Sequence, residues 1–578
     1  MKKNNLLTIA LMASMAFSTV TTQGIVAFAE EQTSGTTTSL KESYSLTIKN
    51  TGNTTHKFEI YQIFKGELTY DNGNKVLSYI EWGEGVNTDK LSDNNIDANA
   101  SKVAEGLKEN NVETFAAGIS KALNTATKSI EIKAGSSETL DLSAGYYFVK
   151  DVDGSQSDSS EGAYTQYLLQ IVGDTETETK LDVPTSLKKV KEDDHEVTGT
   201  TDTRIASFTV GDHYNDVADY SIGETIPYEL VGTLPSNYDK YTTYEYSFVD
   251  KMSDGLTLDY DSVKIYFRSS VTSETETDVT KQASIKVSDD KHSLTVSFSD
   301  LKTAVSEATK DSIFVVRYNA SLNDNAVVGL NGNDNTFHLE YSNNPNGTGT
   351  GKTPDDKNIV FTYELDNEKV TYISAADYEK LTAEDKAKYT ESSYDLNGDG
   401  TNEKVYRRTL SGAKFKLFTT KTDSESGAQG AVIEKGVFKR WDDVSNATEL
   451  SSDENGIIKI KGLDSGIYYI EETEAPSGYN KLTERVKLEL KAETVNDQSW
   501  EGKKANDALK SLTVTLNDKT KVMSDENKGI VKTEIVNYAG STLPSTGGIG
   551  TTIMYVVGGL LVILGGAAII IKRRSDAE

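Results

Sequence analysis

The 578-residue sequence contains no cysteine, so no disulfide stabilises any domain that it forms. Basic residues are also few, because 60 lysines and arginines stand against 89 aspartates and glutamates. The formal charge of −29, with no basic face along the chain, excludes nucleic acid as a partner. The five histidines are scattered, and neither a nucleophile-elbow motif nor an HExxH motif is present. This argues against a surface hydrolase, and we expect no metal and no cofactor.

The N-terminal end has the features of an export signal. Residues 1–29 combine the Lys2-Lys3 start with an apolar stretch and the small-residue site Ala27-Phe28-Ala29. This pattern predicts a secretory signal peptide that is cleaved between Ala29 and Glu30. Residues 30–39 are rich in Ser, Thr and Gly and predict a flexible start of the mature chain. Exported domains without disulfides need large cores or another covalent link.

The C-terminal end, residues 543–578, combines a short motif with an apolar segment. Residues 551–571 are long enough to cross a bilayer once as a helix, and Lys572-Arg573-Arg574 follows as a cytoplasmic stop. The preceding motif is Leu543, Pro544, Ser545, Thr546 and Gly547. The tail resembles the sorting signal of Gram-positive surface proteins, which a sortase cleaves between threonine and glycine. The resemblance implies cleavage after Thr546 and transfer of its carboxyl group to an amine.

Between these ends, the sequence favours β-structure. Thirty tyrosines and a recurring alternation of Thr, Val, Ile and Tyr are typical of strands, and the length suits about three domains. We therefore expect an all-β chain of three tandem immunoglobulin-like β-sandwich domains with a helical insertion. The predicted domains cover residues 40–182, 183–350 and 358–540.

In the first domain, strand-like runs at 44–49 and 57–64 precede an amphipathic pattern that predicts one helix within residues 98–123. Strands return at 145–149 and 164–172, and no internal cross-link is expected in this domain. Lys180 lies at the seam before the next domain. The position of Lys180 resembles that of the polymerising lysine of backbone pilins, which lies near this junction. This resemblance implies that Lys180 attacks the Thr546 acyl intermediate of the next subunit.

Three segments of the second domain place a lysine, an acid and an asparagine on strand-like stretches. They are Leu187-Lys188-Lys189-Val190, Tyr246-Ser247-Phe248-Val249-Asp250 and Leu339-Glu340-Tyr341-Ser342-Asn343-Asn344. Together they resemble the CnaA-like domain of Gram-positive fimbrial shaft proteins. In that family, a lysine and an asparagine form an internal isopeptide bond beside an acid. The resemblance implies Lys188, Asp250 and Asn343 in these roles.

The choice among neighbours follows the family pattern. Lys188 is preferred over Lys189 because its spacing to Val190 matches the family's lysine-x-valine, so both side chains point to one face. Asn343 is preferred over Asn344 because it follows Tyr-Ser. From the residues alone, the simpler interpretation is that Asp250 caps a turn and Asn343 lies in a loop.

The chemistry explains the three residue types. Burial raises the pKa of a carboxyl group and lowers the pKa of an amine, so a lysine inside an apolar core becomes neutral and nucleophilic. The amine then attacks the asparagine carboxamide, and the acid polarises the carboxamide oxygen and relays protons. Ammonia leaves as the bond forms.

The third domain has a sharper signature. Its segments are Leu410-Ser411-Gly412-Ala413-Lys414-Phe415, Tyr468-Tyr469-Ile470-Glu471-Glu472-Thr473-Glu474-Ala475-Pro476-Ser477-Gly478-Tyr479 and Ile535-Val536-Asn537. They resemble the CnaB-type pilin domain, whose E-box carries the acid. The resemblance implies Lys369 as the nucleophile, Glu472 as the acid and Asn537 as the acceptor. Lys404 is the rival nucleophile if the insertion at 370–408 precedes the reactive strand.

The insertion has its own motifs. Residues 375–389 have helix-like spacing, and Asp395-Leu396-Asn397-Gly398-Asp399-Gly400 begins like a calcium loop. A loop of that type needs a carboxylate at its twelfth position, where Tyr406 stands. A glycine-rich turn is therefore the preferred interpretation.

These features predict the major structural subunit of a sortase-polymerised pilus, on the cell wall of a Gram-positive bacterium. The chain is expected to form its own bonds once, with no enzymatic turnover. Expected partners are pilus-class and housekeeping sortases, identical subunits arranged head to tail and peptidoglycan, with minor pilins and host ligands as further candidates. The alternative is a monomeric wall-anchored adhesin that binds a host matrix protein.

Overall fold

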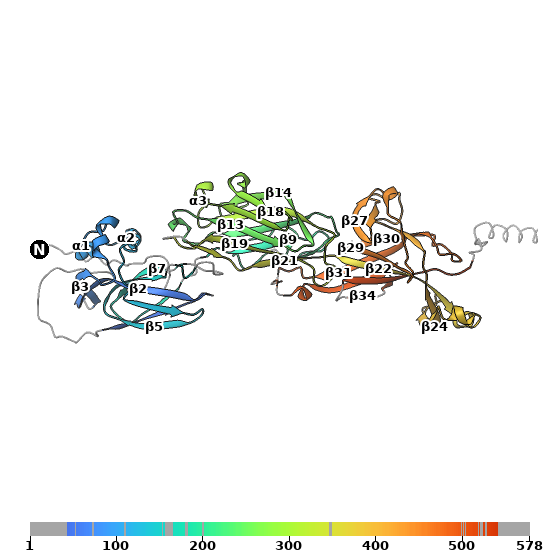
Figure 1. Cartoon of the computed structure of the whole chain (residues 1–578), viewed down its shortest axis with the longest axis horizontal. Helices are drawn as coiled ribbons and strands as arrows, with labels where there is room; N and C mark the ends of the chain where they lie inside the picture. Colours follow the sequence, from blue (N-terminus) through green and yellow to red (C-terminus); the bar gives the residue numbers. More distant parts are fainter. Residues whose placement is uncertain are drawn as a thin grey trace, which may run out of the picture.

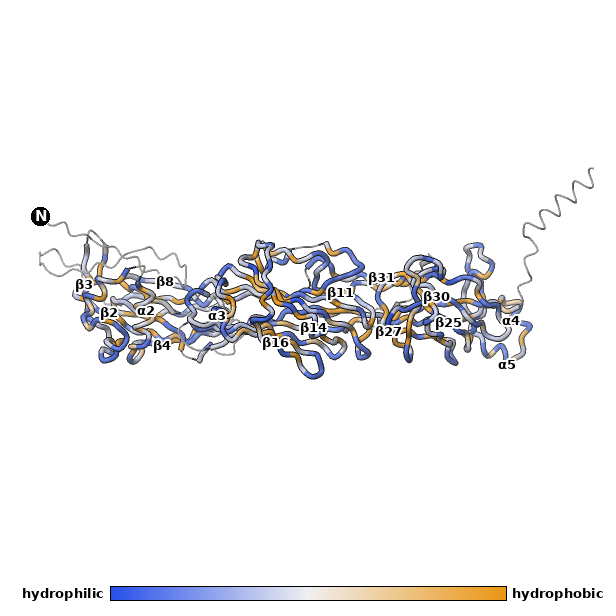
Figure 2. Tube along the Cα trace, turned by 90° about the horizontal axis from the view of Figure 1, so that it is seen from above, coloured by the Kyte–Doolittle hydropathy of each residue, from blue (hydrophilic) through white to orange (hydrophobic). Residues whose placement is uncertain are grey.

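The computed structural model describes residues 43–540, apart from gaps at 53, 72–73, 109–110, 153, 157–163, 165, 180–182, 199–200, 346–348, 499, 501, 503, 518, 521–523 and 526–528. The predicted signal peptide, flexible start and sorting tail lie outside these residues. Three β-rich units follow one another along the long axis (Figure 1). Apolar segments are distributed through all three units (Figure 2). Within the described part of the chain, no helix combines the length and apolarity that a membrane span requires.

The first unit is built from two sheets. Its strands are β1 (Tyr44–Lys49), β2 (His56–Asp71), β3 (Asn74–Trp82), β4 (Lys128–Ile132), β5 (Ser137–Leu142), β6 (Gly145–Asp151), β7 (Gln166–Ile171) and β8 (Thr175–Glu178). One sheet has the order β3-β2-β6-β7, with β4 also paired to β2, and the other has the order β5-β1-β8. Alternating apolar residues of both sheets form the core, as expected for a sandwich.

The single helix predicted within 98–123 is wrong, because the structure contains two short helices. They are α1 (Ala100–Gly106) and α2 (Val112–Ile119), next to the 3-10 turns η1 (Thr88–Lys90) and η2 (Ser92–Asn94). Asn111 stabilises the break: its carboxamide accepts from the Lys108 N–H and donates to the Gly106 carbonyl. Glycine at the end of α1 also disfavours a continuous helix. The ring of Phe115 stacks on Phe64 at 5.8 Å, so α2 still covers the sheet.

The second unit is a larger sandwich. Its strands are β9 (Ser186–Lys191), β10 (Tyr214–Asn215), β11 (Val217–Asp219), β12 (Ile226–Thr233), β13 (Tyr246–Met252), β14 (Leu256–Arg268), β15 (Thr277–Asp278), β16 (Ser284–Val287), β17 (Ser293–Phe298), β18 (Ile313–Leu322), β19 (Asn333–Ser342), β20 (Thr350–Lys352) and β21 (Asp356–Phe361). It also contains α3 (Leu301–Ala304), η3 (Tyr238–Lys240) and η4 (Thr280–Gln282).

Two facing sheets enclose the core of this unit. The first has the order β10-β9-β12-β18-β14-β15, and the second has the order β11-β21-β19-β13-β17-β16, with β20 paired to β19. Strand β21 overlaps the start of the predicted third domain at residue 358, yet it pairs with β19 inside the second unit. Buried tyrosines supply much of the core volume, which compensates for the absence of disulfides.

The third unit is a continuous network of paired strands that folds over its own core. Its strands are β22 (Tyr363–Ser374), β23 (Thr390–Tyr394), β24 (Glu403–Thr409), β25 (Lys414–Phe418), β26 (Gly430–Glu434), β27 (Val437–Asp442), β28 (Leu450–Ser451), β29 (Ile457–Leu463), β30 (Gly466–Glu474), β31 (Val486–Thr494), β32 (Leu509–Leu516), β33 (Lys519–Thr520), β34 (Ser524–Asp525) and β35 (Ile530–Val536). The short helices are α4 (Ala375–Glu379), α5 (Ala383–Lys386), η5 (Val444–Asn446) and η6 (Ala505–Asp507).

The first and last strands of this unit lie side by side. β22 pairs with β35 in parallel, so that Lys369 is opposite Ile535 and Val370 is opposite Val536. The insertion after β22, with α4, α5, β23 and β24, projects from the sandwich (Figure 1). The expected all-β architecture of successive sandwich domains is confirmed.

We predict that Gly232→Ala destabilises the second unit. A Cβ at Gly232 would collide with the Tyr246 hydroxyl and approach Leu339 Cδ1 to 2.9 Å. The collision should lower the free energy of unfolding by about 1–3 kcal/mol, as overpacking of a core does. Calorimetric unfolding measures the change. Gly173→Ala is the control, because a Cβ there meets nothing within 4 Å; equal effects of the two changes would contradict the argument.

Candidate cross-linking sites

In the third unit, the structure brings together the three residues of the predicted site. Lys369 lies on β22, Glu472 on β30 and Asn537 directly after β35, and each is about 1% exposed. Lys369 Nζ is 3.0 Å from Glu472 Oε1 and donates a hydrogen bond to Asn537 Oδ1. Asn537 Nδ2 donates to Glu472 Oε1 at 2.9 Å. The amine, the acid and the carboxamide are therefore in mutual contact.

The surroundings of this triad favour a neutral amine. Burial lowers the pKa of Lys369 to about 8, although the neighbouring Glu472 carboxylate acts in the opposite direction. The ring of Phe415 lies 5.2 Å from the Lys369 amine, and the Leu482 N–H donates to Glu472 Oε2 at 2.7 Å. These contacts hold the buried amine and acid in place.

The rival lysine of this unit lies elsewhere. The side chain of Lys404 is 56% exposed and its Nζ is 2.8 Å from Glu391, on the projecting insertion. Parallel pairing with β35 instead places Lys369 beside the end of the last strand, where Asn537 donates its backbone N–H to the Val370 carbonyl. Strand pairing thus favours Lys369 over Lys404.

In the second unit, the structure brings two of the three predicted residues together. Lys188 Nζ donates to both carboxylate oxygens of Asp250, at 2.9 and 2.8 Å. Both side chains are fully buried, one on β9 and the other on β13 of the facing sheet. Burial lowers the pKa of Lys188, and the adjacent Asp250 opposes this effect.

Asn343 is the member that the structure separates from the group. Its Nδ2 donates to the carbonyls of Gln156, in the first unit, and of Thr350. It follows β19, past the end of the strand, and it faces the first unit instead of Lys188. The interpretation of Asn343 as the partner of Lys188 is therefore corrected.

Asn335 is a buried asparagine that the structure connects to Lys188 and Asp250 through Tyr318. It lies on β19 with 0% exposure, and its Nδ2 donates to Tyr318 Oη at 2.8 Å. Tyr318 Oη in turn accepts from Lys188 Nζ at 3.0 Å and donates to Asp250. Asn335 Oδ1 has no hydrogen-bond partner among the described residues. Lys188, Asp250, Tyr318 and Asn335 thus form one buried polar group.

Sequence reasoning missed Asn335 and Tyr318, although β19 carries a signal for the asparagine. Its side chains alternate between buried and partly exposed, and Asn335 is in phase with the buried Phe337, Leu339 and Tyr341. An asparagine at such a position must find polar partners inside the core. Tyr318 lies on β18, and its ring stacks on Tyr228 at 5.2 Å beneath the Lys188 amine. Nothing in the local sequence distinguishes it from other core tyrosines.

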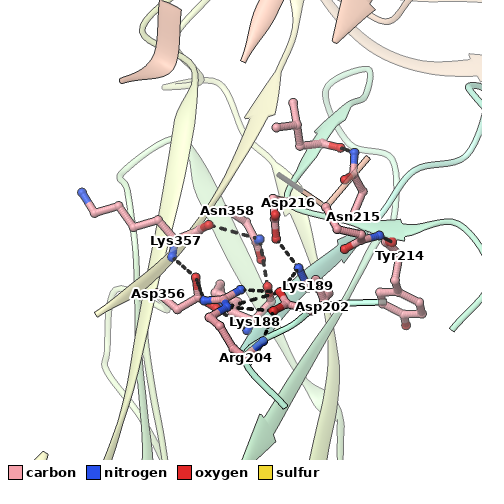
Figure 3. A network of polar contacts seen from close by, with 12 residues as sticks. Lys188, Lys189, Asp202, Arg204, Tyr214, Asn215, Asp216, Asp356, Lys357 and Asn358 are labelled. Atoms are coloured by element: carbon pink, nitrogen blue, oxygen red, sulfur yellow. Dashed lines mark hydrogen bonds and ion pairs between the residues drawn. The ribbon is translucent and has the colours of Figure 1, made fainter. Parts of the chain in front are cut away.

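Asn358, on β21, is directly opposite Asn335 in the strand register. Its Nδ2 donates to the backbone carbonyl of Lys188 at 3.1 Å, whereas Asn335 joins the side-chain group through Tyr318. Figure 3 shows Asn358 beside Lys188 and the polar network of the adjacent lysine. Contact with the amine-bearing group favours Asn335 over Asn358.

Lys189 belongs to a separate network on the opposite face of β9 (Figure 3). Its Nζ donates to Asp202 at 2.9 Å and to Asp216 at 2.6 Å. Arg204 donates to Asp202 and forms an ion pair with Asp356 at 2.8 Å. Burial alone would raise the pKa of Asp202, but the hydrogen bonds from Arg204 and Lys189 lower it below its usual range. Lys189 is thus paired with two carboxylates, which supports the choice of Lys188.

The remaining predicted residues include several outside the described part of the chain. These are Ala29, Glu30, Lys180, Leu543, Pro544, Ser545, Thr546 and Gly547. In the insertion, the Asp395 carboxylate accepts the backbone N–H groups of Gly398, Asp399 and Gly400. These bonds are those of a glycine-rich turn.

Comparison with known families gives three matches along this chain. Residues 222–345 match the model described as Gram-positive pilin backbone subunit 2, Cna-B-like domain. Residues 401–504 match the SpaA prealbumin-like fold domain, and residues 535–578 match the LPXTG cell wall anchor motif. The motifs of the second domain resemble those of CnaA-like domains, whereas the family model that matches residues 222–345 is described as Cna-B-like.

Among curated proteins, the chain is similar to the trypsin-resistant surface T6 protein of Streptococcus pyogenes serotype M6. The two are 26% identical over 390 residues, which cover 61% of this chain and 65% of that protein. The chain therefore aligns with just under two thirds of the relative's length.

Solved structures that match this chain include the T6 backbone pilin of the same serotype, with 18% identity, a TM-score of 0.47, and coverage of 87% of this chain and 100% of that one. The major pilin SpaD of Corynebacterium diphtheriae has 13% identity, a TM-score of 0.42, and coverage of 88% and 100%. The pilus 2b backbone protein of group B streptococcus has 19% identity, a TM-score of 0.37, and coverage of 57% and 97%.

We predict that Glu472→Ala destabilises the third unit strongly. The change leaves the Lys369 amine buried without its acid, and breaking such a buried pair costs about 3–5 kcal/mol. Calorimetric unfolding of the third unit measures the loss. Glu474→Ala is the matched control, because the Glu474 side chain is 61% exposed and pairs with Lys414 at the surface. If Glu472→Ala lowered the free energy of unfolding no more than Glu474→Ala does, the buried pair would contribute little to stability.

Proposed function

We propose that this chain, a Gram-positive pilus backbone subunit by its pilin domains and its LPXTG anchor, is the repeating unit of a covalently linked surface shaft. Its anchor motif places it outside the cell, attached to the cell wall. The observation that carries the proposal is the buried contact of Lys369, Glu472 and Asn537, in which an amine, an acid and a carboxamide meet in the core.

The triad in the third unit supports formation of an isopeptide bond. The neutral Lys369 Nζ attacks Asn537 Cγ, a new N–C bond forms and the bond from Cγ to Nδ2 breaks. Glu472 contacts both nitrogens, so it can take a proton from the amine and deliver one to the departing ammonia. The reaction needs no external reagent, because ammonia is the only product released.

The second unit supports the same reaction with Lys188, Asp250 and Asn335. Asp250 contacts the amine, and Tyr318 connects the amine, the acid and the carboxamide of Asn335. We assign Tyr318 as a positioning residue. Its hydroxyl holds the amide nitrogen of Asn335, which is the group that leaves.

The two bonds have a mechanical consequence for the fold. They would close loops of roughly 150 and 170 residues, for which the chain-entropy model gives about 5 kcal/mol each. The bond in the third unit would join strand β22 directly to the end of β35. Tension along the chain would then load covalent bonds and bypass much of the sandwich.

Linkage between subunits completes the proposal. A pilus-class sortase cleaves between Thr546 and Gly547 and transfers the Thr546 carboxyl group to Lys180 of the next subunit. A housekeeping sortase attaches the finished polymer to peptidoglycan. Minor pilins and host surface ligands are further partners in this proposal, and catalysis between subunits belongs to the sortases.

We predict a mass deficit in the denatured fragment spanning residues 30–540. Each isopeptide bond expels one ammonia, about 17 Da, so two bonds leave the chain about 34 Da lighter than its sequence. Intact-mass spectrometry measures the deficit. A deficit of zero would contradict internal cross-linking in both units.

Single substitutions separate the assignments, with each mass compared to that of its own sequence. Asn335→Ala and Glu472→Ala should each reduce the deficit to about 17 Da, because one bond is lost. Asn343→Ala and Asn358→Ala are the matched controls and should keep the full deficit. Loss of a bond in either control, with none in Asn335→Ala, would refute the assignment of Asn335.

We predict that Lys180→Arg abolishes polymerisation in cells that carry the sortases. Arginine keeps the positive charge but stays protonated, so it cannot attack the acyl intermediate. Denaturing gels of cell-wall extracts should show a ladder for the native chain and only monomer for Lys180→Arg. Thr546→Ala should remove both the ladder and the wall attachment.

Lys128→Arg is the control for this experiment, because Lys128 is an exposed lysine on β4 of the first unit. It should leave the ladder intact. A ladder that persists in Lys180→Arg would exclude Lys180 as the polymerising lysine. The absence of a ladder for the native chain would favour the monomeric adhesin.

A further inference from the structure

A group of acidic side chains around one histidine lies where the second and third units meet. Glu192, Asp194 and His195 follow β9, and Asp219 ends β11. Each offers one ligand atom, and these four atoms all lie within 4.8 Å of one another. Asp194 Oδ2 accepts from Ser465 Oγ of the third unit at 3.0 Å, so the group bridges the two units.

The orientation of His195 is that of a metal ligand. Its Nε2 is 3.1 Å from the Ala492 carbonyl on β31, so Nε2 carries a proton and donates it there. Its Nδ1 faces carboxylate oxygens of Asp194 at 2.6 Å, Asp219 at 3.3 Å and Glu192 at 3.4 Å. Histidines that bind metals typically donate their second ring N–H to a backbone carbonyl or a carboxylate.

The buried carboxylate of Asp219 provides a second, independent observation. Its side chain is 0% exposed, and neither carboxylate oxygen accepts a hydrogen bond from any described residue. Its Oδ1 forms an ion pair with His195 Nδ1 at 3.3 Å, and the buried Tyr363 lies near the carboxylate. Buried carboxylates are normally hydrogen-bonded or coordinated to a metal, because their desolvation is costly. The Asp219 carboxylate therefore belongs to the group, and its oxygen atoms are available to coordinate an ion.

The charge balance of the junction points in the same direction. Three further acids, Asp193, Glu224 and Asp464, lie near these carboxylates. Within the described ranges, no lysine or arginine forms an ion pair with any of the six acids, and His195 is their one cationic partner. A divalent cation would offset this excess of negative charge.

We propose that Glu192, Asp194, His195 and Asp219 bind one divalent transition-metal ion of the zinc or manganese type, which fixes the second unit against the third. One imidazole nitrogen with three carboxylates suits these ions, whereas calcium prefers six to eight oxygen ligands. Asp194 and His195 are partly exposed and give the ion a route into the site. The proposal is independent of isopeptide chemistry, because none of these residues belongs to either cross-linking group.

Metal titration of the full chain tests the proposal. The chain is purified in mild detergent, stripped with a chelator and titrated calorimetrically with Zn²⁺, Mn²⁺, Ca²⁺ and Mg²⁺ in separate runs. We expect one equivalent of Zn²⁺ or Mn²⁺ to bind, and Ca²⁺ and Mg²⁺ to bind more weakly. Failure of both Zn²⁺ and Mn²⁺ to bind stoichiometrically would overturn the proposal and leave a protonated His195 as the sole counter-charge.

Variants identify the site of binding. Asp219→Asn and His195→Gln should weaken binding by about tenfold or more, since even residues that only support a ligand have effects of that size. Asp193→Asn removes the same charge next to the site, and His338→Gln removes a histidine that lies 3.0 Å from Asp355 at the surface. Both controls should bind as the native chain does. Unchanged binding in Asp219→Asn would overturn the proposal.

X-ray absorption of the zinc-loaded native chain keeps the test independent of variant folding. The expected shell contains one imidazole nitrogen with carboxylate oxygens. A shell of oxygen alone would contradict the role of His195. Intact mass after metal loading provides a separate readout, since the predicted loss of ammonia does not depend on the metal.

Discussion

The physical constraint on which the two larger sandwiches depend is the burial of a lysine amine beside a carboxyl group. Lys188 and Lys369 are buried on strands β9 and β22. An unpaired amine there would strongly destabilise the fold, and an acid from another strand pairs with each of them. The cores are organised around these pairs. In the second unit, the stacked rings of Tyr228 and Tyr318 line the amine, and in the third unit Phe415 lies beside it. Burial favours the neutral amine that nucleophilic attack requires, so the arrangement that makes the pair costly also makes it reactive.

The candidate triad of the third unit is predicted by its resemblance to CnaB-type domains, and the strand patterns of the sequence agree with two of its members. Glu472 is at an inward position of an alternating strand, and Asn537 directly follows the alternating run that ends at Val536. The choice between Lys369 and Lys404 required more. It depends on the parallel pairing of β22 with β35, a contact between the two ends of the unit that local periodicity does not encode.

The asparagine of the second unit shows where sequence reasoning stops. Asn335 and Asn343 have the same parity along the chain, so alternation alone cannot choose between them. The register of β13 against β19 favours Asn335, because it sets Asp250 opposite Phe337 and Met252 opposite Asn335, whereas β19 has ended before Asn343. The break between α1 and α2 has a similar origin. The carboxamide of Asn111 satisfies the backbone of a turn, and such local competition is invisible in a hydrophobic period.

A shaft under tension transmits force through the junctions between its units. The junction between the second and third units is closely packed and hydrogen-bonded. Ile222 donates its backbone N–H to Gly462 at 3.0 Å, and Asp464 donates its backbone N–H to Ser221 Oγ at 3.2 Å. Gly462 has a φ of +92°, and a Cβ there would collide with Ile222, so the two backbones can approach closely only with glycine. Such close packing resists bending, but it also confines the surrounding carboxylates at low dielectric, where repulsion between them is strongest. A cation between Asp219 and His195 would convert that repulsion into attraction across the junction.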